Sequence, residues 1–244
     1  EPWTIVVIKE DYLVIIPARG GSKRLPGKNI KDLCGKPLIQ WTIDAVRAVK
    51  PDIVEVMVST DCEKIADLSI KGGAEVPFIR DSSLALDMSS TVDVVKSVIE
   101  YYKHKGREFE FVLVLQPTSP LRSTNQIEEA LELLKAKQAD SIVSVCPAEH
   151  SPLWSNTLDE SHSMSAFIAE EFKTTRSQDL PAYYRLNGAL YLTRVVRFLE
   201  EEAFLLSDNS YAYVMDSKSS VDIDEEIDFL LAKVILENRD GPNV

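Results

Sequence analysis

The sequence predicts a three-layer α/β/α domain built on a mixed, mainly parallel β-sheet. Short apolar runs alternate with amphipathic segments at the spacing of strand–helix–strand crossovers, which favours parallel strands covered by helices on both faces. The most apolar run, FEFVLVLQP at 109–117, is typical of a central strand buried on both faces. A length of 244 residues fits one large domain, and 45% hydrophobic with 27% charged residues is ordinary for a globular protein.

The first strand is expected at 12–18, where YLVIIPA is a short apolar run that ends in proline and alanine. The helix after it, at 37–49, begins with a proline, the residue favoured in a first helical turn. Its apolar residues Ile39, Ile43 and Val46 recur at helical spacing, so one face of this helix should be buried.

The alternation continues through the middle of the chain. A helix at 62–73 ends in two glycines, and a second at 90–106 ends in one. A third, at 123–137, opens with a capping box formed by Ser123 and Gln126. The strands expected between these helices are 52–59, 74–79, 109–117 and 141–146.

The pattern changes after the strand at 141–146. Residues 148–182 are polar and carry no sustained period, and strand-like runs resume at 186–193 and 211–216 before a last helix at 225–238. The predicted organisation is an α/β domain made of 11–147 and 183–244, an inserted segment at 148–182, and an extension of undecided structure at 1–10.

Composition excludes several classes of protein. A net charge of −12 disfavours general nucleic-acid binding, and no apolar run reaches the roughly 18 residues that span a bilayer. Cys34, Cys62 and Cys146 are odd in number and lack CxxC spacing, so they are expected to be reduced thiols in a cytoplasm. No leader peptide and no HExxH or GxSxG motif is recognisable.

A basic, glycine-rich loop follows the first strand of this acidic chain. Its sequence, ARGGSKRLPGKNIK, lies between a strand and a helix, where many α/β proteins bind phosphate. It matches neither the Walker A loop nor the GxGxxG fingerprint. A solvated turn is the alternative, but the density of charge in an acidic chain favours an anion site. The five cations are Arg19, Lys23, Arg24, Lys28 and Lys31.

Two carboxylates precede the last helix. Asp222 and Asp224 flank Ile223, and residues two apart in an extended segment face the same way. Carboxylate oxygens beside a phosphate suit Mg²⁺. Asp224 could also cap the helix, and the two roles are compatible.

A rigid turn, QPTSPLR, follows the central strand. Gln116, Thr118 and Ser119 offer hydrogen-bonding groups at the carboxyl end of that strand, where open α/β sheets bind ligands. A purely structural turn is the alternative. Asp61, at the end of another strand, is equally compatible with a ligand contact and with a helix cap.

Taken together, these motifs resemble the CMP-N-acetylneuraminic acid synthetase family, the cytidylyltransferases that activate sialic and related nonulosonic acids. The resemblance runs from Tyr12 nearly to the end of the chain, and one departure is Asp81 after Arg80, where the family usually has proline. The matching motifs are IIPARGGSKRLPGKN, STD (59–61), IRDSSLALD (79–87), LQPTSPLR (115–122), RSQDLPAYYRLNGALY (176–191) and VDIDEEID (221–228).

The resemblance implies a Rossmann-like fold of the nucleotide-diphospho-sugar transferase type and a reaction of CTP with a nine-carbon sugar acid, releasing pyrophosphate. It assigns Lys28, Arg19, Asp222 and Asp224 to catalysis, with Mg²⁺ or Mn²⁺ on the two aspartates. It assigns to CTP the residues Arg19, Lys23, Lys28, Asn29, Arg80, Ala85 and Asp87. It assigns to the sugar acid Gln116, Thr118, Ser119, Arg176, Asn187 and Tyr191, although Tyr191 taken alone is typical of a core aromatic.

The resemblance also implies that 148–182 is an arm that crosses to a second subunit of a homodimer. This segment contains too many large apolar residues for a plain solvated loop: Trp154, Met164, Phe167, Ile168 and Phe172. Lys173 or Arg176 would reach the neighbour's site, with Arg176 favoured. The alternative is an arm folded back on a monomer.

Two alternative functions stay open at this point. One is a 3-deoxy-manno-octulosonate cytidylyltransferase, whose first loop also contains an RLPGK-like run. The other is a non-catalytic regulator that binds nucleotide sugars on the same fold. Lys23, Asn29 and the QDLP and NGALY segments favour the nine-carbon class, with a neuraminic or legionaminic configuration preferred.

Overall fold

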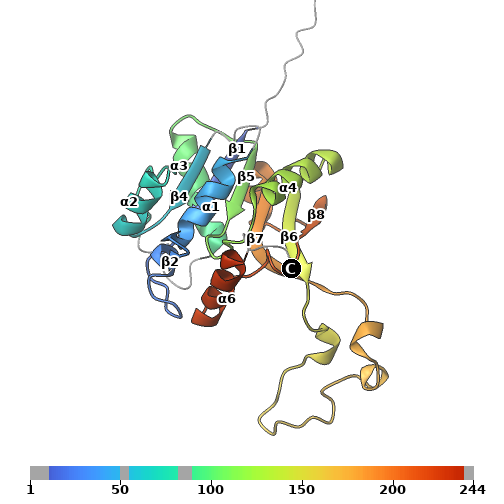
Figure 1. The fold of residues 1–244 in the computed structure, drawn as a ribbon. Coiled ribbons are helices and arrows are strands. Elements are labelled where there is room, and N and C mark those ends of the chain that lie inside the picture. Colours follow the sequence, from blue (N-terminus) through green and yellow to red (C-terminus); the bar gives the residue numbers. More distant parts are fainter. Residues whose placement is uncertain (1–10, 50–54, 82–89, 239–244) are drawn as a thin grey trace, which may run out of the picture.

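The structure, a computed structural model, describes residues 11–49, 55–81 and 90–238. It contains a six-stranded sheet, a two-stranded hairpin and six α-helices within those ranges (Figure 1). The strands of the large sheet are β1 (Tyr12–Pro17), β4 (Glu55–Ser59), β5 (Phe111–Leu115), β6 (Ser141–Pro147), β7 (Tyr184–Arg194) and β8 (Ser210–Val214). The hairpin is β2 (Asp32–Leu33) with β3 (Lys36–Pro37). The helices are α1 (Leu38–Arg47), α2 (Glu63–Lys71), α3 (Thr91–His104), α4 (Thr124–Lys137), α5 (Val195–Glu201) and α6 (Glu226–Glu237).

The large sheet is mixed and mainly parallel, as the alternation of elements predicts. Its strand order is β4-β1-β5-β7-β6-β8, and β7 alone runs antiparallel to its two neighbours. The antiparallel direction of β7 follows from its connection, because the arm leaves β6 and returns beside it as a long hairpin. The carboxyl ends of β1, β4 and β5 therefore meet at one edge of the sheet.

Helices cover both faces of the sheet, which gives three layers (Figure 1). Alternate residues of each strand point to opposite faces, so Val14 and Ile16 of β1 pack with α1, α2 and α4, whereas Leu13 and Ile15 pack with α3 and α5. All four side chains are fully buried. A third apolar cluster joins α6 to the segment that ends the basic loop.

The helix signals in the sequence are confirmed. Ser123 accepts a hydrogen bond from the backbone of Gln126, whose side chain accepts one in return, and α4 begins there. α3 begins with an equivalent box formed by Ser90 and Asp93. The last helix differs, because Glu225 and Asp228 form its capping box and Asp224 does not cap it.

Two element predictions need correction, and one helix was missed. Residues 74–79 do not form a strand, because only one isolated bridge, Met57 with Glu75, joins them to the sheet. α5 was not predicted from the sequence, since seven residues are too few to set a helical period. The strand at 186–193 is longer than expected and runs from Tyr184 to Arg194 as β7. The extension at 1–10 lies outside the described residues.

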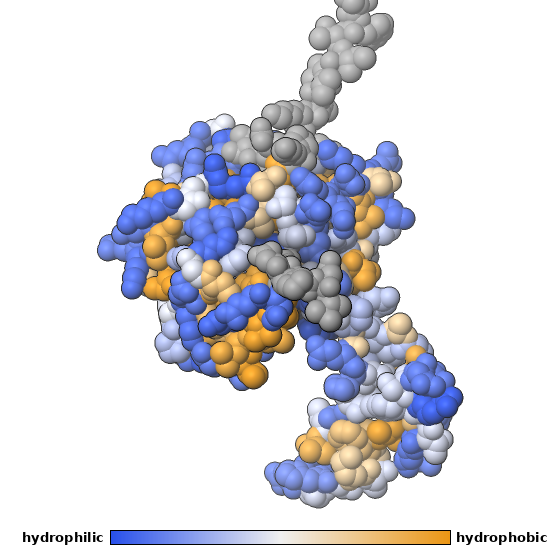
Figure 2. Space-filling model, in the orientation of Figure 1, coloured by the Kyte–Doolittle hydropathy of each residue, from blue (hydrophilic) through white to orange (hydrophobic). Residues whose placement is uncertain are grey.

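The inserted segment is an arm that projects from the body between β6 and β7 (Figure 1). It holds three short 3-10 helices, at Pro152–Trp154, Glu170–Phe172 and Ser177–Asp179, and none of its residues from 148 to 182 is buried. Apolar side chains gather on the arm and, separately, where α6 lies (Figure 2). The arm therefore does not fold back to bury its apolar residues on its own subunit.

Two expectations from composition can be compared with the described part of the chain. None of its helices combines the length and apolar character needed to cross a bilayer. Cys34, Cys62 and Cys146 are free thiols, which confirms that they form no disulfide with one another. The cytoplasmic location inferred from them stays a prediction.

Candidate active site

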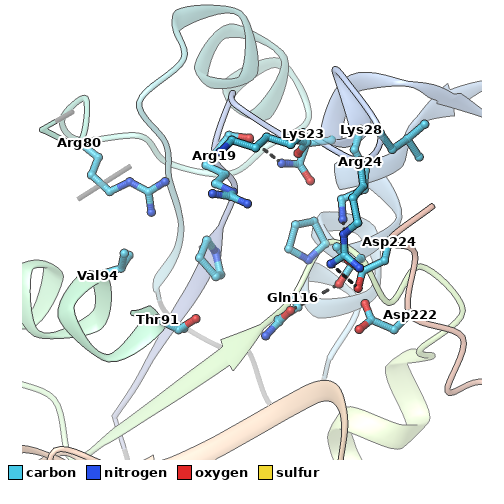
Figure 3. A pocket seen from close by; sticks show the side chains of 16 residues that line it. Arg19, Lys23, Arg24, Lys28, Arg80, Thr91, Val94, Gln116, Asp222 and Asp224 are labelled. Atoms are coloured by element: carbon cyan, nitrogen blue, oxygen red, sulfur yellow. Dashed lines mark hydrogen bonds and ion pairs between the residues drawn. The ribbon is translucent and has the colours of Figure 1, made fainter. Parts of the chain in front are cut away.

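A cavity of about 570 Å³ opens at the sheet edge where β1 and β5 end. Its volume suits a nucleotide-sized ligand. The basic loop after β1 forms one wall, the turn after β5 the floor, and the segment before α6 closes the side (Figure 3). The sixteen lining residues are Pro17, Arg19, Ser22, Lys23, Arg24, Leu25, Lys28, Asn29, Arg80, Thr91, Val94, Gln116, Pro117, Thr118, Asp222 and Asp224.

Five of these side chains are cations, although the whole chain is acidic: Arg19, Lys23, Arg24, Lys28 and Arg80. Arg80 is almost completely buried, and burial lowers the pKa of its guanidinium; the nearby charge of Arg19 acts in the same direction, and the carboxylate of Asp61 opposes both. A cation whose charged form is disfavoured by burial and by a neighbouring cation gains from an anionic ligand. The cavity is therefore an anion site.

The basic loop is held in shape by contacts that the sequence did not reveal. Asp61 accepts a hydrogen bond from the Gly20 amide at 2.9 Å and lies 3.7 Å from the Arg80 guanidinium. Asn29 is buried, and its side-chain amide donates to the Arg19 carbonyl at 3.0 Å. Asp61 thus ties the loop to Arg80, and it is Cys62, not Asp61, that stands at the N-cap of α2.

Gly20 makes a close approach that excludes any side chain. A Cβ atom there would lie 2.9 Å from the Cβ of Cys62, which is closer than real Cβ contacts. Replacing Gly20 with alanine should therefore push the loop off Asp61, destabilise the fold by about 1–3 kcal/mol and weaken nucleotide binding. Denaturant unfolding and CTP titration measure the two effects.

The matched control is Gly21→Ala, because a Cβ at Gly21 would meet no atom within 4 Å. Equal losses in the two variants would mean that loop flexibility matters rather than contact with Cys62.

Lys28 and the two carboxylates lie together, although nearly 200 residues separate them in sequence. The Lys28 ammonium donates to the Ile223 carbonyl at 2.6 Å and to Asp224 at 3.3 Å, and Arg24 pairs with the other oxygen of Asp224 at 2.8 Å (Figure 3). The prediction that Lys28, Asp222 and Asp224 share a site is thus supported by the geometry.

The raised pKa of Asp222 identifies it as the more enclosed of the two carboxylates. Burial is the main cause of the raised pKa of Asp222. The charge of Asp224 raises this pKa further, and a hydrogen bond from Thr118 lowers it. An ionised carboxylate held in an enclosed site gains from a nearby cation. Asp222 and Asp224 supply hard oxygen donors, and two carboxylates suit Mg²⁺, which keeps several waters and takes the rest of its ligands from phosphates. No group of three or more acidic, histidine or cysteine side chains that could hold a metal occurs in the described ranges.

The turn after β5 brings Gln116 and Thr118 to the floor. The Thr118 hydroxyl lies 3.4 Å from the side-chain oxygen of Gln116, and the Thr118 carbonyl accepts a hydrogen bond from the Ile223 amide at 2.8 Å. Gly188 of β7, with a φ of +71°, lies against Gln116 and Asp222, since a Cβ there would be 3.9 Å from each side chain. The turn after β5, the middle of β7 and the segment before α6 are far apart in sequence, so the sequence does not indicate that they lie together.

The remaining predicted residues do not line this cavity. Ser119 is buried in the turn, and Tyr191 packs against Phe204 at 5.0 Å between ring centroids. Asn187 is also buried, and its amide is engaged by Ser144 and Ser220. The assignment of these three residues to the sugar acid stays a prediction. Arg176 lies on the arm, paired with Asp179 at 2.8 Å, and Ala85 and Asp87 lie outside the described residues.

The cavity also contains residues to which the sequence assigned no individual role. Arg24 was counted among the five cations of the basic loop, and the structure places it in the cavity lining. Thr91 and Val94 belong to the first turn of α3, and no motif marks them.

The fold and the cavity define an α/β protein that binds a phosphate-bearing ligand at the carboxyl edge of its parallel strands. The chain belongs to the cytidylyltransferase family, whose sequence profile matches residues 13–235.

Relatives in sequence cover nearly the whole chain. It is 36% identical to the CMP-N,N'-diacetyllegionaminic acid synthase of Legionella pneumophila, over 92% of this chain and 96% of the relative. It is 35% identical to the pseudaminic acid cytidylyltransferase of Campylobacter jejuni, over 91% and 95%. An N-acylneuraminate cytidylyltransferase of Streptococcus agalactiae is 37% identical over 89% of this chain and 51% of that protein.

Solved structures share the fold at low identity. A CTP complex of CMP:2-keto-3-deoxy-manno-octonic acid synthetase has a TM-score of 0.68 at 18% identity, covering 94% of this chain and 99% of the other. The 4-diphosphocytidyl-2C-methyl-D-erythritol synthase of Anaerococcus prevotii has a TM-score of 0.62 at 16% identity, covering 93% and 99%. These likenesses confirm the predicted Rossmann-like nucleotidyltransferase fold.

Proposed function

We propose that this protein transfers the cytidylyl group of CTP to a nine-carbon nonulosonic acid and releases pyrophosphate. The observation that carries the proposal is one cavity in which Lys28 and four further cations face Gln116 and a pair of carboxylates. Family membership and relatives named for legionaminic, pseudaminic and N-acylneuraminic acids support the substrate class.

In this reaction the anomeric hydroxyl of the sugar acid attacks the α-phosphorus of CTP in line with the departing pyrophosphate. Such chemistry requires positioning and charge neutralisation rather than a covalent intermediate. Arg19, Lys23, Lys28 and Asn29 would hold the triphosphate, and Arg80 the cytosine side. Lys28 is held by the Ile223 carbonyl, so its charge is oriented before the negative charge builds on the α-phosphate.

Asp222 and Asp224 would hold Mg²⁺ or Mn²⁺, which neutralises phosphate charge when bound. Arg24 and Lys28 both contact Asp224, and both also line the cavity that would hold the triphosphate. Nucleotide binding would therefore draw these two cations from Asp224 to phosphate oxygens and leave the carboxylate available to the metal.

Replacing Asp224 with alanine should raise the Mg²⁺ concentration for half-maximal turnover by about tenfold and lower kcat, because one metal-holding carboxylate is lost. Melting should change little, since Asp224 is 41% exposed and does not cap α6. Mg²⁺ titration and thermal melting are measured on the same variant.

Glu226→Ala is the matched control. Glu226 also pairs a surface carboxylate with a loop lysine, Lys31, but does not line the cavity. An unchanged Mg²⁺ requirement in Asp224→Ala would remove Asp224 from the metal site.

The homodimer belongs to the same proposal. The arm carries exposed Leu158 and Met164 away from the body, and a twofold interface is the commonest way to bury such side chains (Figure 2). Arg176, with 73% of its side chain exposed, would reach the partner's cavity.

Pyrophosphate release from CTP and Mg²⁺, assayed with a panel of sugar acids, tests the function. The panel holds N-acetylneuraminate, legionaminate, pseudaminate and 3-deoxy-manno-octulosonate, because identities of 35–37% do not separate the nine-carbon acids. Release with a nine-carbon acid is expected. Release with the octulosonate alone would favour the second candidate, and CTP binding without release would favour a binding-only protein.

A further inference from the structure

Arg122 is the largest fully buried side chain among the described residues, and it lies directly beneath the cavity floor. It closes the turn that begins at Gln116, but it does not line the cavity itself. In the described part of the chain no carboxylate lies within ion-pair distance of its guanidinium. A buried charge without a counter-charge is costly, so this arginine needs an explanation beyond packing.

The guanidinium contacts three oxygen atoms from three different elements. It donates to the Ala189 carbonyl of β7 at 2.6 Å, to the Gln116 carbonyl at 3.3 Å and to the Thr42 hydroxyl of α1 at 2.9 Å. The planar, rigid fork of arginine can reach several acceptors in fixed directions, which lysine cannot do. Its Nε atom is buried with no hydrogen-bond partner in the described ranges.

These contacts lie at the end of the pairing between β5 and β7, next to the cavity. The ladder between β5 and β7 ends with the pair Leu115 and Leu190, and the two carbonyls that Arg122 holds belong to the next residues, Gln116 and Ala189. Beyond this point the two strands are no longer paired, Gln116 lines the cavity, and Gly188 lies against the Gln116 side chain. The fork therefore bridges the two backbones at the position where direct pairing stops.

The positive charge of Arg122 strengthens its hydrogen bonds to the two carbonyls. Burial lowers the pKa of the Arg122 guanidinium to about 9, which leaves it protonated at neutral pH. Hydrogen bonds from an ionised donor in a buried site are stronger than neutral ones. The floor is thus fixed before any ligand arrives.

We propose that Arg122 is a positioning residue for the sugar-acid half of the active site, because its guanidinium fixes the separation of β5 and β7 and so the placement of Gln116. This inference rests on the proposed function, which gives the Gln116 side of the cavity to the sugar acid. Arg122 touches neither substrate, and its effect passes through Gln116 and Gly188.

Arg122→Lys tests the fork, since lysine keeps a positive charge but loses the planar set of donors. We expect kcat/KM for the sugar acid, at saturating CTP, to fall by about 10–100-fold, because small displacements of a binding group are costly to rate. The dissociation constant of CTP, measured without sugar, should change by less than about twofold. Arg194→Lys, at the opposite end of β7, is the control and should leave both values unchanged.

A double-mutant cycle with Gln116→Ala identifies the route of the effect. If Arg122 acts through Gln116, then Arg122→Lys should lower kcat/KM by less than about threefold once Gln116 is alanine. Full additivity, wild-type kinetics in Arg122→Lys, or an equal loss of CTP affinity would each overturn the inference.

Thermal melting accompanies every variant. Should Arg122→Lys fail to fold, Thr42→Val removes only one acceptor of the fork and should lower kcat/KM for the sugar acid in the same direction, and an unchanged value would overturn the inference. A wild-type protein that releases no pyrophosphate with any acid of the panel would overturn the proposed function together with this inference, whereas an active wild type with unimpaired variants overturns this inference alone.

Discussion

Replacing Lys28 with methionine should lower kcat for pyrophosphate release by about 10²–10³-fold while weakening CTP binding far less. Methionine keeps the length of the side chain and removes its charge. The Lys28 side chain is only 11% exposed and is oriented by the Ile223 carbonyl at 2.6 Å. An oriented charge in an enclosed site contributes most where negative charge increases during the reaction, which is at the α-phosphate.

Steady-state kinetics and equilibrium CTP titration separate the two possible roles of Lys28. Lys31→Met is the matched control, because Lys31 belongs to the same basic loop but pairs with Glu226 and lies over the Phe229 ring, outside the cavity lining. A Lys28→Met protein with normal kcat and only weaker CTP binding would show that Lys28 merely tethers the nucleotide.

The sequence predicted the half of the site that depends on local order. Arg19 and Gln116 follow β1 and β5, and the carboxyl ends of neighbouring parallel strands meet at one edge, so their proximity follows from the alternation of elements. The basic loop needed only its charge and glycine content to be recognised. These are properties that a single stretch of chain carries.

The other half depends on contacts between distant segments. Asp222 and Asp224 reach Lys28 because the Ile223 amide bonds to the Thr118 carbonyl, a pairing that no local pattern encodes. Asp61 was considered as a cap or a ligand contact; it does not cap α2, and it ties Gly20 to Arg80. Short polar side chains serve caps, turns and tertiary bridges equally well, so their role follows only from the neighbours that the fold supplies.

Asn187 shows what a motif resemblance leaves open. The resemblance assigned it to the sugar pocket, and in the structure its buried amide bonds to Ser144 and Ser220. A buried amide must satisfy its donors and acceptors, so these bonds fix its orientation. The neighbouring Gly188 lies against Gln116 and Asp222, and a direct contact of Asn187 with the sugar acid stays a prediction.

Deleting the arm should give a monomer with little activity. The arm leaves β6 and returns to β7, and the pair Pro147 with Tyr184 closes its base, so a short turn could replace residues 148–183 without disturbing the sheet. None of the removed residues from 148 to 182 is buried in this chain, so its own core should survive. Sedimentation measures the oligomeric state, and pyrophosphate release measures the activity.

Mixing two inactive chains tests whether the arm completes the partner's site. Arg176→Ala removes the exposed arm cation, and Lys28→Ala disables the cavity of the other chain. A mixed dimer would hold one site with both residues intact, so co-refolded chains should recover up to about a quarter of wild-type activity, because half of randomly paired dimers are mixed and each has one working site of two.

Lys173→Ala is the control for the arm. Lys173 pairs with Glu170 and is only 42% exposed, whereas Arg176 is 73% exposed and opens the RSQDLP segment. We expect Lys173→Ala to retain most of the activity by itself. Properly formed mixed dimers without recovered activity would refute the shared site even if the protein proved dimeric, because an arm that serves only to hold two subunits together needs no particular cation at position 176.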